Sequence, residues 1–207
     1  MGLLYRYKRK LFKYIEYLQY DPEKYWEQEG GEKYFNNFHT LSDRNEEVFL
    51  EEIEKAKPNS VLDLGCGYGR YLKVINDRFP NIKLTGCEIS QSQINRAIKF
   101  LNNEEIDLVK TDGKSLPLKD KAFDLVITYG CLSLVKQNDL IKFYQEIERV
   151  AHKGLFLEYY VKGEPLRHHI YHYNYDYYKL FNKQLIKTER LGDNGDTLWY
   201  VDLSQSS

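Results

Sequence analysis

A glycine-rich run, VLDLGCGYGR at residues 61–70, places a glycine at every second position from Gly65. Glycine permits a tight turn and lets a ligand approach bare backbone at the N-terminus of a helix. The dinucleotide pattern GxGxxG requires glycine at position 70, where this chain has Arg70. Asp63, two residues before the first glycine, would repel a pyrophosphate but suits a ligand that carries an ammonium and a sulfonium.

Three carboxylates lie at the ends of successive apolar runs. Asp63 ends the first, Glu88 ends the second, and Asp112 follows the third in the sequence KTDGK. The carboxyl ends of parallel strands border one crevice, which is the usual ligand position in an open α/β sheet. Glu88 is placed to accept hydrogen bonds from ribose hydroxyls, and Asp112 from an adenine amino group. Each acid alone fits a solvated loop residue or a helix cap, but together with the glycine loop they indicate a nucleoside-containing ligand.

The elements that position these residues alternate between strand and helix. The strand-like runs are SVLDLG, IKLTGCEI, IDLVKTD, FDLVITYG and GLFLEYY, and helices are predicted over 42–57, 69–79, 90–102, 137–150 and 175–183. Two more strand-like runs flank Gly192–Gly195, which is typical of an antiparallel hairpin. The sequence therefore predicts an α/β, Rossmann-like fold: a mostly parallel seven-stranded sheet, helices on both faces, and an antiparallel C-terminal hairpin.

The segments VLDLGCGYGRYL, LTGCEIS, KTDGKSLPLKDKAFDLVITYGCLSLV and EIERVAHKGLFLEYY resemble the successive motifs of class I S-adenosylmethionine-dependent methyltransferases. The resemblance covers residues 44–161, and its LP…FD segment is similar to that of the small-molecule methyltransferases. It implies S-adenosyl-L-methionine as cofactor. The residues that would then contact the cofactor are Asp63, Gly65, Cys66, Gly67, Glu88, Ile89, Asp112, Gly113 and Tyr129.

The N-terminal 43 residues precede this domain, which is predicted over 44–207. Residues 3–18 form a basic, aromatic-rich amphipathic pattern that fits either a capping helix or peripheral contact with a membrane. The stretch that follows resembles the lid such enzymes place over the cofactor, with Tyr34 as a cofactor contact. Arg44 is a candidate partner for the methionine carboxylate.

A His/Tyr-rich insert at 159–184 is the predicted acceptor region. His168, His169 and His172 are the candidate general bases, since imidazole titrates near neutrality. Tyrosines combine flat faces with hydroxyls and suit sugars or aromatic rings, although they also fit packing on the sheet. Glu158 is expected to face the same crevice. The predicted acceptor is a small molecule or glycan-pathway intermediate, methylated at oxygen, with no metal involved.

Charge and cysteine content narrow the alternatives. An RNA methyltransferase is the second hypothesis. The net charge of −1 argues against it, because binding to nucleic-acid phosphates draws on a surplus of cations. A non-catalytic S-adenosylmethionine-binding regulatory module is a third, and Arg70 and Asp63 disfavour a nicotinamide oxidoreductase. Three cysteines in no recognised pattern predict reduced thiols and a cytoplasmic protein.

Overall fold

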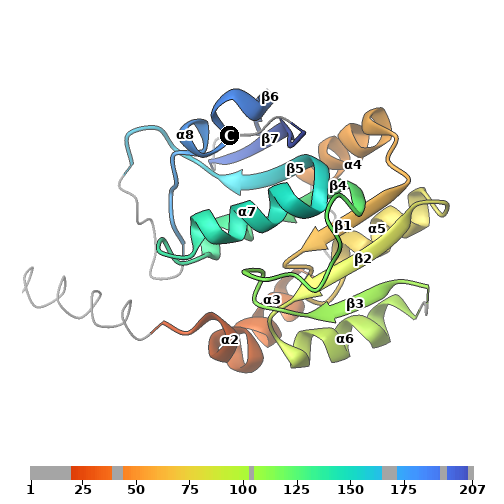
Figure 1. Ribbon diagram of the computed structural model, residues 1–207. Coiled ribbons are helices and arrows are strands. Elements are labelled where there is room, and N and C mark those ends of the chain that lie inside the picture. Colours follow the sequence, from red (N-terminus) through yellow and green to blue (C-terminus); the bar gives the residue numbers. More distant parts are fainter. Residues whose placement is uncertain (1–19, 39–43, 103–104, 165–171, 192–194, 205–207) are drawn as a thin grey trace, which may run out of the picture.

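Seven strands form one sheet in the computed structural model, which describes residues 20–38, 44–102, 105–164, 172–191 and 195–204 (Figure 1). The strands are β1 (Ser60–Leu64), β2 (Lys83–Glu88), β3 (Asp107–Lys110), β4 (Phe123–Tyr129), β5 (Ala151–Tyr159), β6 (Leu185–Arg190) and β7 (Asp196–Asp202). Their order is β3-β2-β1-β4-β5-β7-β6. The first five pair in parallel, and β7 runs antiparallel to both β5 and β6. The predicted Rossmann-like sheet and its antiparallel hairpin are confirmed.

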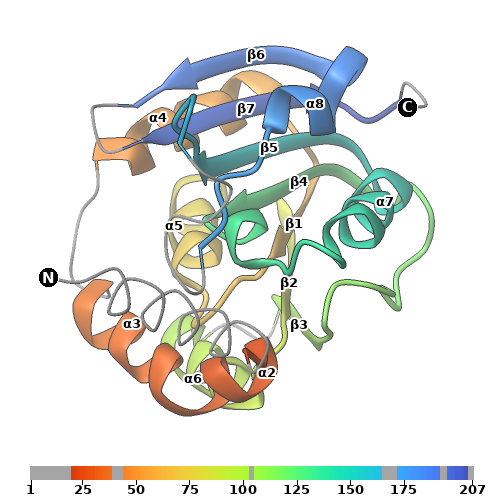
Figure 2. The ribbon, with the colours of Figure 1, turned by 90° about the vertical axis from the view of Figure 1, so that its left-hand side faces the viewer.

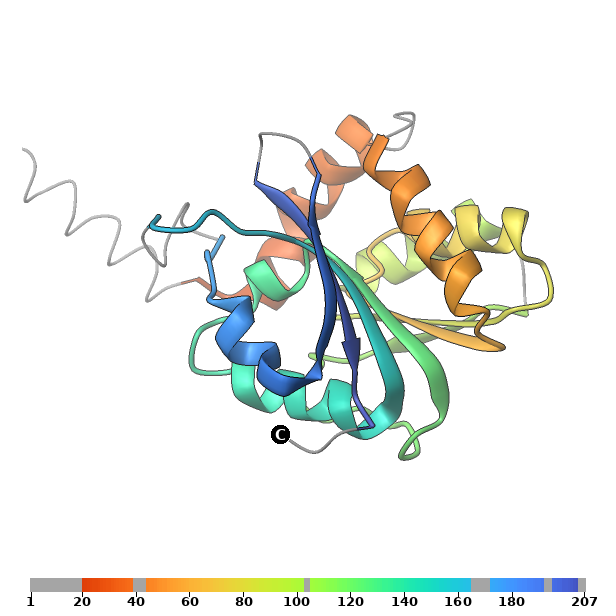
Figure 3. The ribbon, with the colours of Figure 1, turned by 90° about the horizontal axis from the view of Figure 1, so that it is seen from above.

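Helices cover both faces of this sheet. The helical segments are α2 (Pro22–Tyr25), the π-helical η1 (Trp26–Gly30), α3 (Gly31–Phe38), α4 (Arg44–Ala56), α5 (Arg70–Arg78), α6 (Gln91–Leu101), η2 (Leu132–Leu134), α7 (Leu140–Val150), α8 (Tyr177–Phe181) and η3 (Asn182–Gln184). Figure 3 shows α4 and α5 on one side of the sheet and α7 and α8 on the other. None of the described helices is long and apolar enough to cross a membrane. The amphipathic segment 3–18 lies outside the described residues.

Successive residues of β1 enter two separate hydrophobic clusters, because strand side chains alternate between faces. Val61 packs in a cluster with Phe49 of α4 and Leu72 of α5. Leu62 packs in the other, with Ile147 of α7. Burial on both faces explains why the strand runs are almost continuously apolar.

The last helix is shorter than the predicted 175–183. Asp176 caps α8 by accepting a hydrogen bond from Lys179 N at 3.2 Å, so the helix begins after it. Asn182 has a φ of +42°, a left-handed value that ends the α-helix.

Candidate functional site

A cavity of about 590 Å³ opens at the carboxyl ends of the parallel strands, between the sheet and α2–α3. Ten of the predicted contact residues line it: Asp63, Gly65, Cys66, Gly67, Glu88, Ile89, Asp112, Gly113, Tyr129 and Tyr34. Arg44 is the first residue of α4, and its side chain lies outside the described part of the chain. The fold therefore brings residues from four strand ends and the N-terminal segment to one cavity; their contact with a ligand stays a prediction.

The glycine loop after β1 has backbone angles that favour glycine. Gly65 and Gly67 have φ values of +83° and +56°. A Cβ built on Gly65 would lie 2.5 Å from Cys131 Sγ. The loop is therefore closely packed against the segment that follows β4, and a side chain at position 65 has no room.

Glu88 closes the glycine loop from the end of β2. Its Oε2 accepts a hydrogen bond from Gly67 N at 3.0 Å, and its Oε1 accepts from Ile89 N and Ser90 N at 2.9 Å each. Burial raises the pKa of Glu88 above its usual value, and the three backbone donors oppose that rise. The carboxylate is thus held at the cavity wall in one orientation, with further acceptor capacity for a ligand hydroxyl.

Asp63 is a buried carboxyl group with an unused acceptor. Its side chain is 3% exposed, and among the described residues Oδ2 has no hydrogen-bond partner. Burial, with the nearby Glu88 carboxylate, raises the pKa of Asp63 to about 8. A buried acceptor without a donor is costly unless a ligand supplies one. An ammonium group on a ligand fits this position, because it brings both the donor and the compensating charge.

Residues 22–38, here called the lid segment, lie against α6 (Figure 2). Trp26 and Tyr34 contribute to the cavity lining. Glu27 accepts hydrogen bonds from Ser90 Oγ at 2.8 Å and from Ser92 N at 3.1 Å, and so joins the lid segment to the N-terminus of α6. These donors lower the pKa of Glu27. Glu27 thus docks the lid segment beside Ser90, and Glu23 adds an ion pair with Lys110 of β3 at 2.7 Å.

Replacing Glu27 by alanine is expected to open the lid segment while the sheet stays folded, because Ser90 still caps α6. Loss of a capping carboxylate is worth about 1 kcal/mol, or about a fivefold larger open population. Limited proteolysis within residues 22–38 should accelerate by about that factor. The control is Asp77→Ala, which removes a carboxylate paired with Lys73 on the surface of α5. Equal cleavage of both variants and the wild type would contradict the docking role.

The segment after β4 forms another wall of the cavity. Tyr129 stacks on Tyr71 with ring centroids 4.4 Å apart, and both line the cavity. Glu158 does not line it, so the expectation that this residue faces the crevice is wrong. It is 1% exposed and accepts hydrogen bonds from Thr128 Oγ1 at 2.7 Å, Leu132 N at 2.9 Å and Ser133 N at 3.0 Å. Burial raises the pKa of Glu158 to about 7.

Of the three candidate bases, His172 lines the cavity and is exposed. His168 and His169 lie outside the described residues. The cavity thus has one imidazole among its described side chains, and its role as a base stays a prediction.

The tyrosines that follow His172 pack into the core. Tyr173, Tyr175 and Tyr177 are buried in the cluster beside α7. Tyr175 donates its hydroxyl to Val135 O at 2.6 Å, and Tyr173 N donates to Ser133 O at 2.7 Å. Tyrosine at every second position from 171 to 177 is the strand-like alternation that indicates one buried face. For these three residues, packing on the sheet is therefore the correct interpretation, and substrate contact is not.

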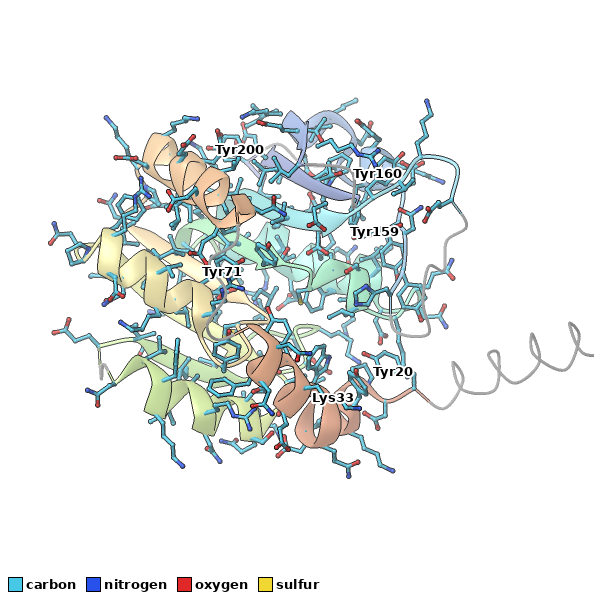
Figure 4. All side chains as sticks on the ribbon, turned by 180° about the vertical axis from the view of Figure 1, so that it is seen from behind. Tyr20, Lys33, Tyr71, Tyr159, Tyr160 and Tyr200 are labelled. Carbon is cyan, nitrogen blue, oxygen red and sulfur yellow. The ribbon has the colours of Figure 1, made fainter. Side chains whose placement is uncertain are left out.

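Sequence reasoning did not predict several residues of the cavity lining. They include Arg70, Tyr71, Lys136, Tyr159 and Asp196. Arg70, considered above only as a missing glycine, is 8% exposed and pairs with Glu46 at 3.0 Å. Figure 4 shows Tyr71 on α5 and Tyr159 at the end of β5. Their only sequence signal is position: Arg70 and Tyr71 begin the helix after the glycine loop, and Tyr159 ends a strand.

Comparison with known proteins finds similarity to methyltransferases. A family model described as "Methyltransferase domain" matches residues 61–154. Norajmaline N-methyltransferase of Rauvolfia serpentina is 31% identical over 102 residues, which cover 47% of this chain and 34% of that protein. Probable tRNA methyltransferase 9B of Homo sapiens is 27% identical over 135 residues, which cover 64% of this chain and 27% of that protein. Other curated relatives are named for methylation at oxygen and at carbon.

Among solved structures, magnesium protoporphyrin IX methyltransferase (ChlM) from Synechocystis PCC 6803 with bound SAM superposes with a TM-score of 0.67. The match has 13% sequence identity and covers 87% of this chain and 94% of that one, so it shows the fold. The chain spans only about a third of the length of curated relatives such as the Rauvolfia enzyme. The relatives' names span nitrogen, oxygen, carbon and tRNA acceptors, and they leave the acceptor of this chain undetermined.

Proposed function

From the premise that this chain is a class I S-adenosylmethionine-dependent methyltransferase by domain and fold, we propose that it methylates a small acceptor held in the 590 Å³ cavity. The observation that carries this proposal is Asp63, whose buried Oδ2 has no partner among the described residues and lies beside the glycine loop. That position suits the ammonium of the cofactor's methionine part. Glu88 then accepts from the ribose hydroxyls, and Asp112 accepts from the adenine amino group.

When bound, S-adenosylmethionine supplies an electrophilic methyl group on its sulfonium. The chain's own contribution is to bind and align, because in-line displacement depends mainly on positioning the two reactants. Trp26 and Tyr34 of the lid segment line the cavity and reduce the access of water to a bound ligand. The lower polarity that results strengthens the electrostatic contacts within the cavity.

For the acceptor, we propose a hydroxyl of a small or sugar-containing molecule. Two described features support an oxygen acceptor: His172 at the cavity as proton acceptor, and the aromatic walls at Trp26 and Tyr159. An RNA acceptor is the second candidate, because a relative of this chain is named as a tRNA methyltransferase. The net charge of −1 disfavours it, since RNA binding draws on a surplus of cations. The three unpaired cysteines support a cytoplasmic location.

Calorimetric titration tests the cofactor part of the proposal. We expect saturable binding of S-adenosylmethionine and of its product S-adenosylhomocysteine, and none of NAD. Glu88→Gln keeps the size of the side chain and removes its charge, so affinity should fall about tenfold. Preference for NAD would overturn the proposal. Transfer of labelled methyl is then assayed on sugars, small acids, amines and RNA, and product mass spectrometry identifies the methylated atom. Label on none of these classes would contradict small-acceptor methylation.

A further inference from the structure

Residues 130–135, here called the β4 loop, form one wall of the cavity. Gly130, Cys131, Ser133, Leu134 and Val135 all line it. The loop is also the neighbour that leaves no room for a side chain at Gly65, through Cys131 Sγ. A small shift of the β4 loop therefore changes the width of the cavity at the glycine loop.

Two sets of hydrogen bonds hold the β4 loop on the side away from the cavity: one set is accepted by its carbonyl groups and the other is donated by its amide groups. The carbonyl groups of Ser133 and Val135 accept hydrogen bonds from Tyr173 N and the Tyr175 hydroxyl. Its amide groups need an acceptor, and Glu158 supplies it: Oε1 accepts from Leu132 N, and Oε2 accepts from Ser133 N. These amides begin the short helix η2, whose first N–H groups have no partner within the helix.

We propose that Glu158 is a positioning residue, whose carboxylate fixes the β4 loop against the glycine loop and so sets the cavity width that cofactor binding requires. This inference rests on the proposed function for its link to the cofactor. Glu158 itself does not line the cavity, and it acts through Leu132 and Ser133.

A carboxylate fits this position better than any neutral side chain of its size. Oε1 already receives two donors, Thr128 Oγ1 and Leu132 N, and Oε2 receives Ser133 N. The ionised Glu158 carboxyl group only accepts, so all three donors are satisfied. Its pKa is raised to about 7, so the readouts below are taken at pH 8, where the ionised form predominates. In Glu158→Gln the amide nitrogen replaces one oxygen and places N–H groups against a donor. The side-chain volume is nearly unchanged, so the substitution mainly removes the hydrogen bonds that hold the β4 loop.

The test combines two readouts on Glu158→Gln. The first is the rate at which Cys131 is alkylated in the native protein, followed by peptide mass spectrometry. Cys131 belongs to the loop, and the fully buried Cys87 of β2 serves as the internal reference. The second is the affinity for S-adenosylhomocysteine by calorimetry. We expect alkylation about tenfold faster and affinity about tenfold weaker, the change that follows from losing a charge-assisted hydrogen bond.

The matched control is Tyr144→Phe. It removes another buried hydrogen bond of the same core, from the Tyr144 hydroxyl to Gln184 Oε1 at 2.8 Å, and Tyr144 does not line the cavity. Its melting temperature should fall, while Cys131 alkylation and ligand affinity stay within about twofold of the wild type. Thr128→Val removes only one of the donors to Glu158 and should shift both readouts in the same direction by less. This variant decides the matter if Glu158→Gln does not fold.

The outcomes separate this inference from the proposed function. If Glu158→Gln lowers the melting temperature but leaves alkylation and affinity at wild-type values, Glu158 is only structural and the inference is overturned. If the wild type itself does not bind S-adenosylhomocysteine, the proposed function fails. The alkylation rate still reports whether Glu158 holds the loop.

Discussion

Wild-type affinity for S-adenosylhomocysteine is expected to rise roughly fiftyfold from pH 6 to pH 8, and Asp63→Asn is expected to remove most of that rise. The pKa of Asp63 is raised to about 8 in the free protein, so at pH 6 the carboxyl group is protonated. Pairing with the ligand's ammonium requires the ionised form, and the apparent affinity scales with the fraction of that form. About one proton is therefore released on binding at pH 6.

The measurement is calorimetry at several pH values in two buffers of different ionisation enthalpy, which gives the number of protons released. At pH 8, Asp63→Asn should bind about a hundredfold more weakly than the wild type, because the ligand's charge is then buried without a partner. At pH 6 the two proteins should differ far less. A wild-type affinity that does not change with pH would show that Asp63 does not meet the ammonium.

The pH dependence of stability provides the control for this experiment: stability should fall with rising pH, whereas ligand affinity should rise. A carboxyl group whose pKa is raised by folding stabilises the protein at low pH and loses that contribution as pH rises from 3.8 through about 8. The free wild type should therefore lose stability towards pH 8. Asp63→Asn removes this loss, so its melting temperature at pH 8 should equal or exceed that of the wild type. Weak binding by a variant that is at least as stable cannot come from unfolding.

Sequence reasoning was most successful where chemistry depends on local pattern. The alternation of strands, glycine loop and helices predicted the parallel strands at the centre of the sheet. The acids at the strand ends line the cavity because the carboxyl ends of parallel strands lie at one edge of the sheet. Asp63 and Glu88 were found in this way. Their burial, and the pKa shifts that follow from it, depend on the packed neighbours and have no signal in spacing.

Contacts between distant segments were beyond sequence reasoning. Glu158 and Tyr159 are adjacent at the end of β5, yet Tyr159 lines the cavity and Glu158 is buried behind the β4 loop. Alternation along a strand separates two such residues but does not say which face borders the cavity. The same limit applies to Glu27, whose docking on α6 depends on where the lid segment packs.

Gly65→Ala is expected to abolish detectable binding of S-adenosylhomocysteine. The φ of +83° at Gly65 costs any residue with a Cβ about 1–2 kcal/mol, and the added atom would lie 2.5 Å from Cys131 Sγ and 2.9 Å from Cys131 Cβ. The glycine loop and the β4 loop must then move apart at the position where the ligand's methionine part is proposed to lie. Calorimetry measures the loss, and circular dichroism checks that the sheet is retained.

Two further variants separate backbone strain from the steric contact. Gly163→Ala places alanine at a nearly identical φ of +85°, and no atom of the described residues lies within 4 Å of the added Cβ. It therefore reproduces the strain alone, and its ligand affinity should match the wild type. The double variant Gly65→Ala with Cys131→Gly removes the contact but keeps the strain, and should recover part of the binding. If the double variant binds no better than Gly65→Ala, contact with Cys131 does not cause the loss. The close approach of the two loops would then not be what shapes the proposed cofactor site.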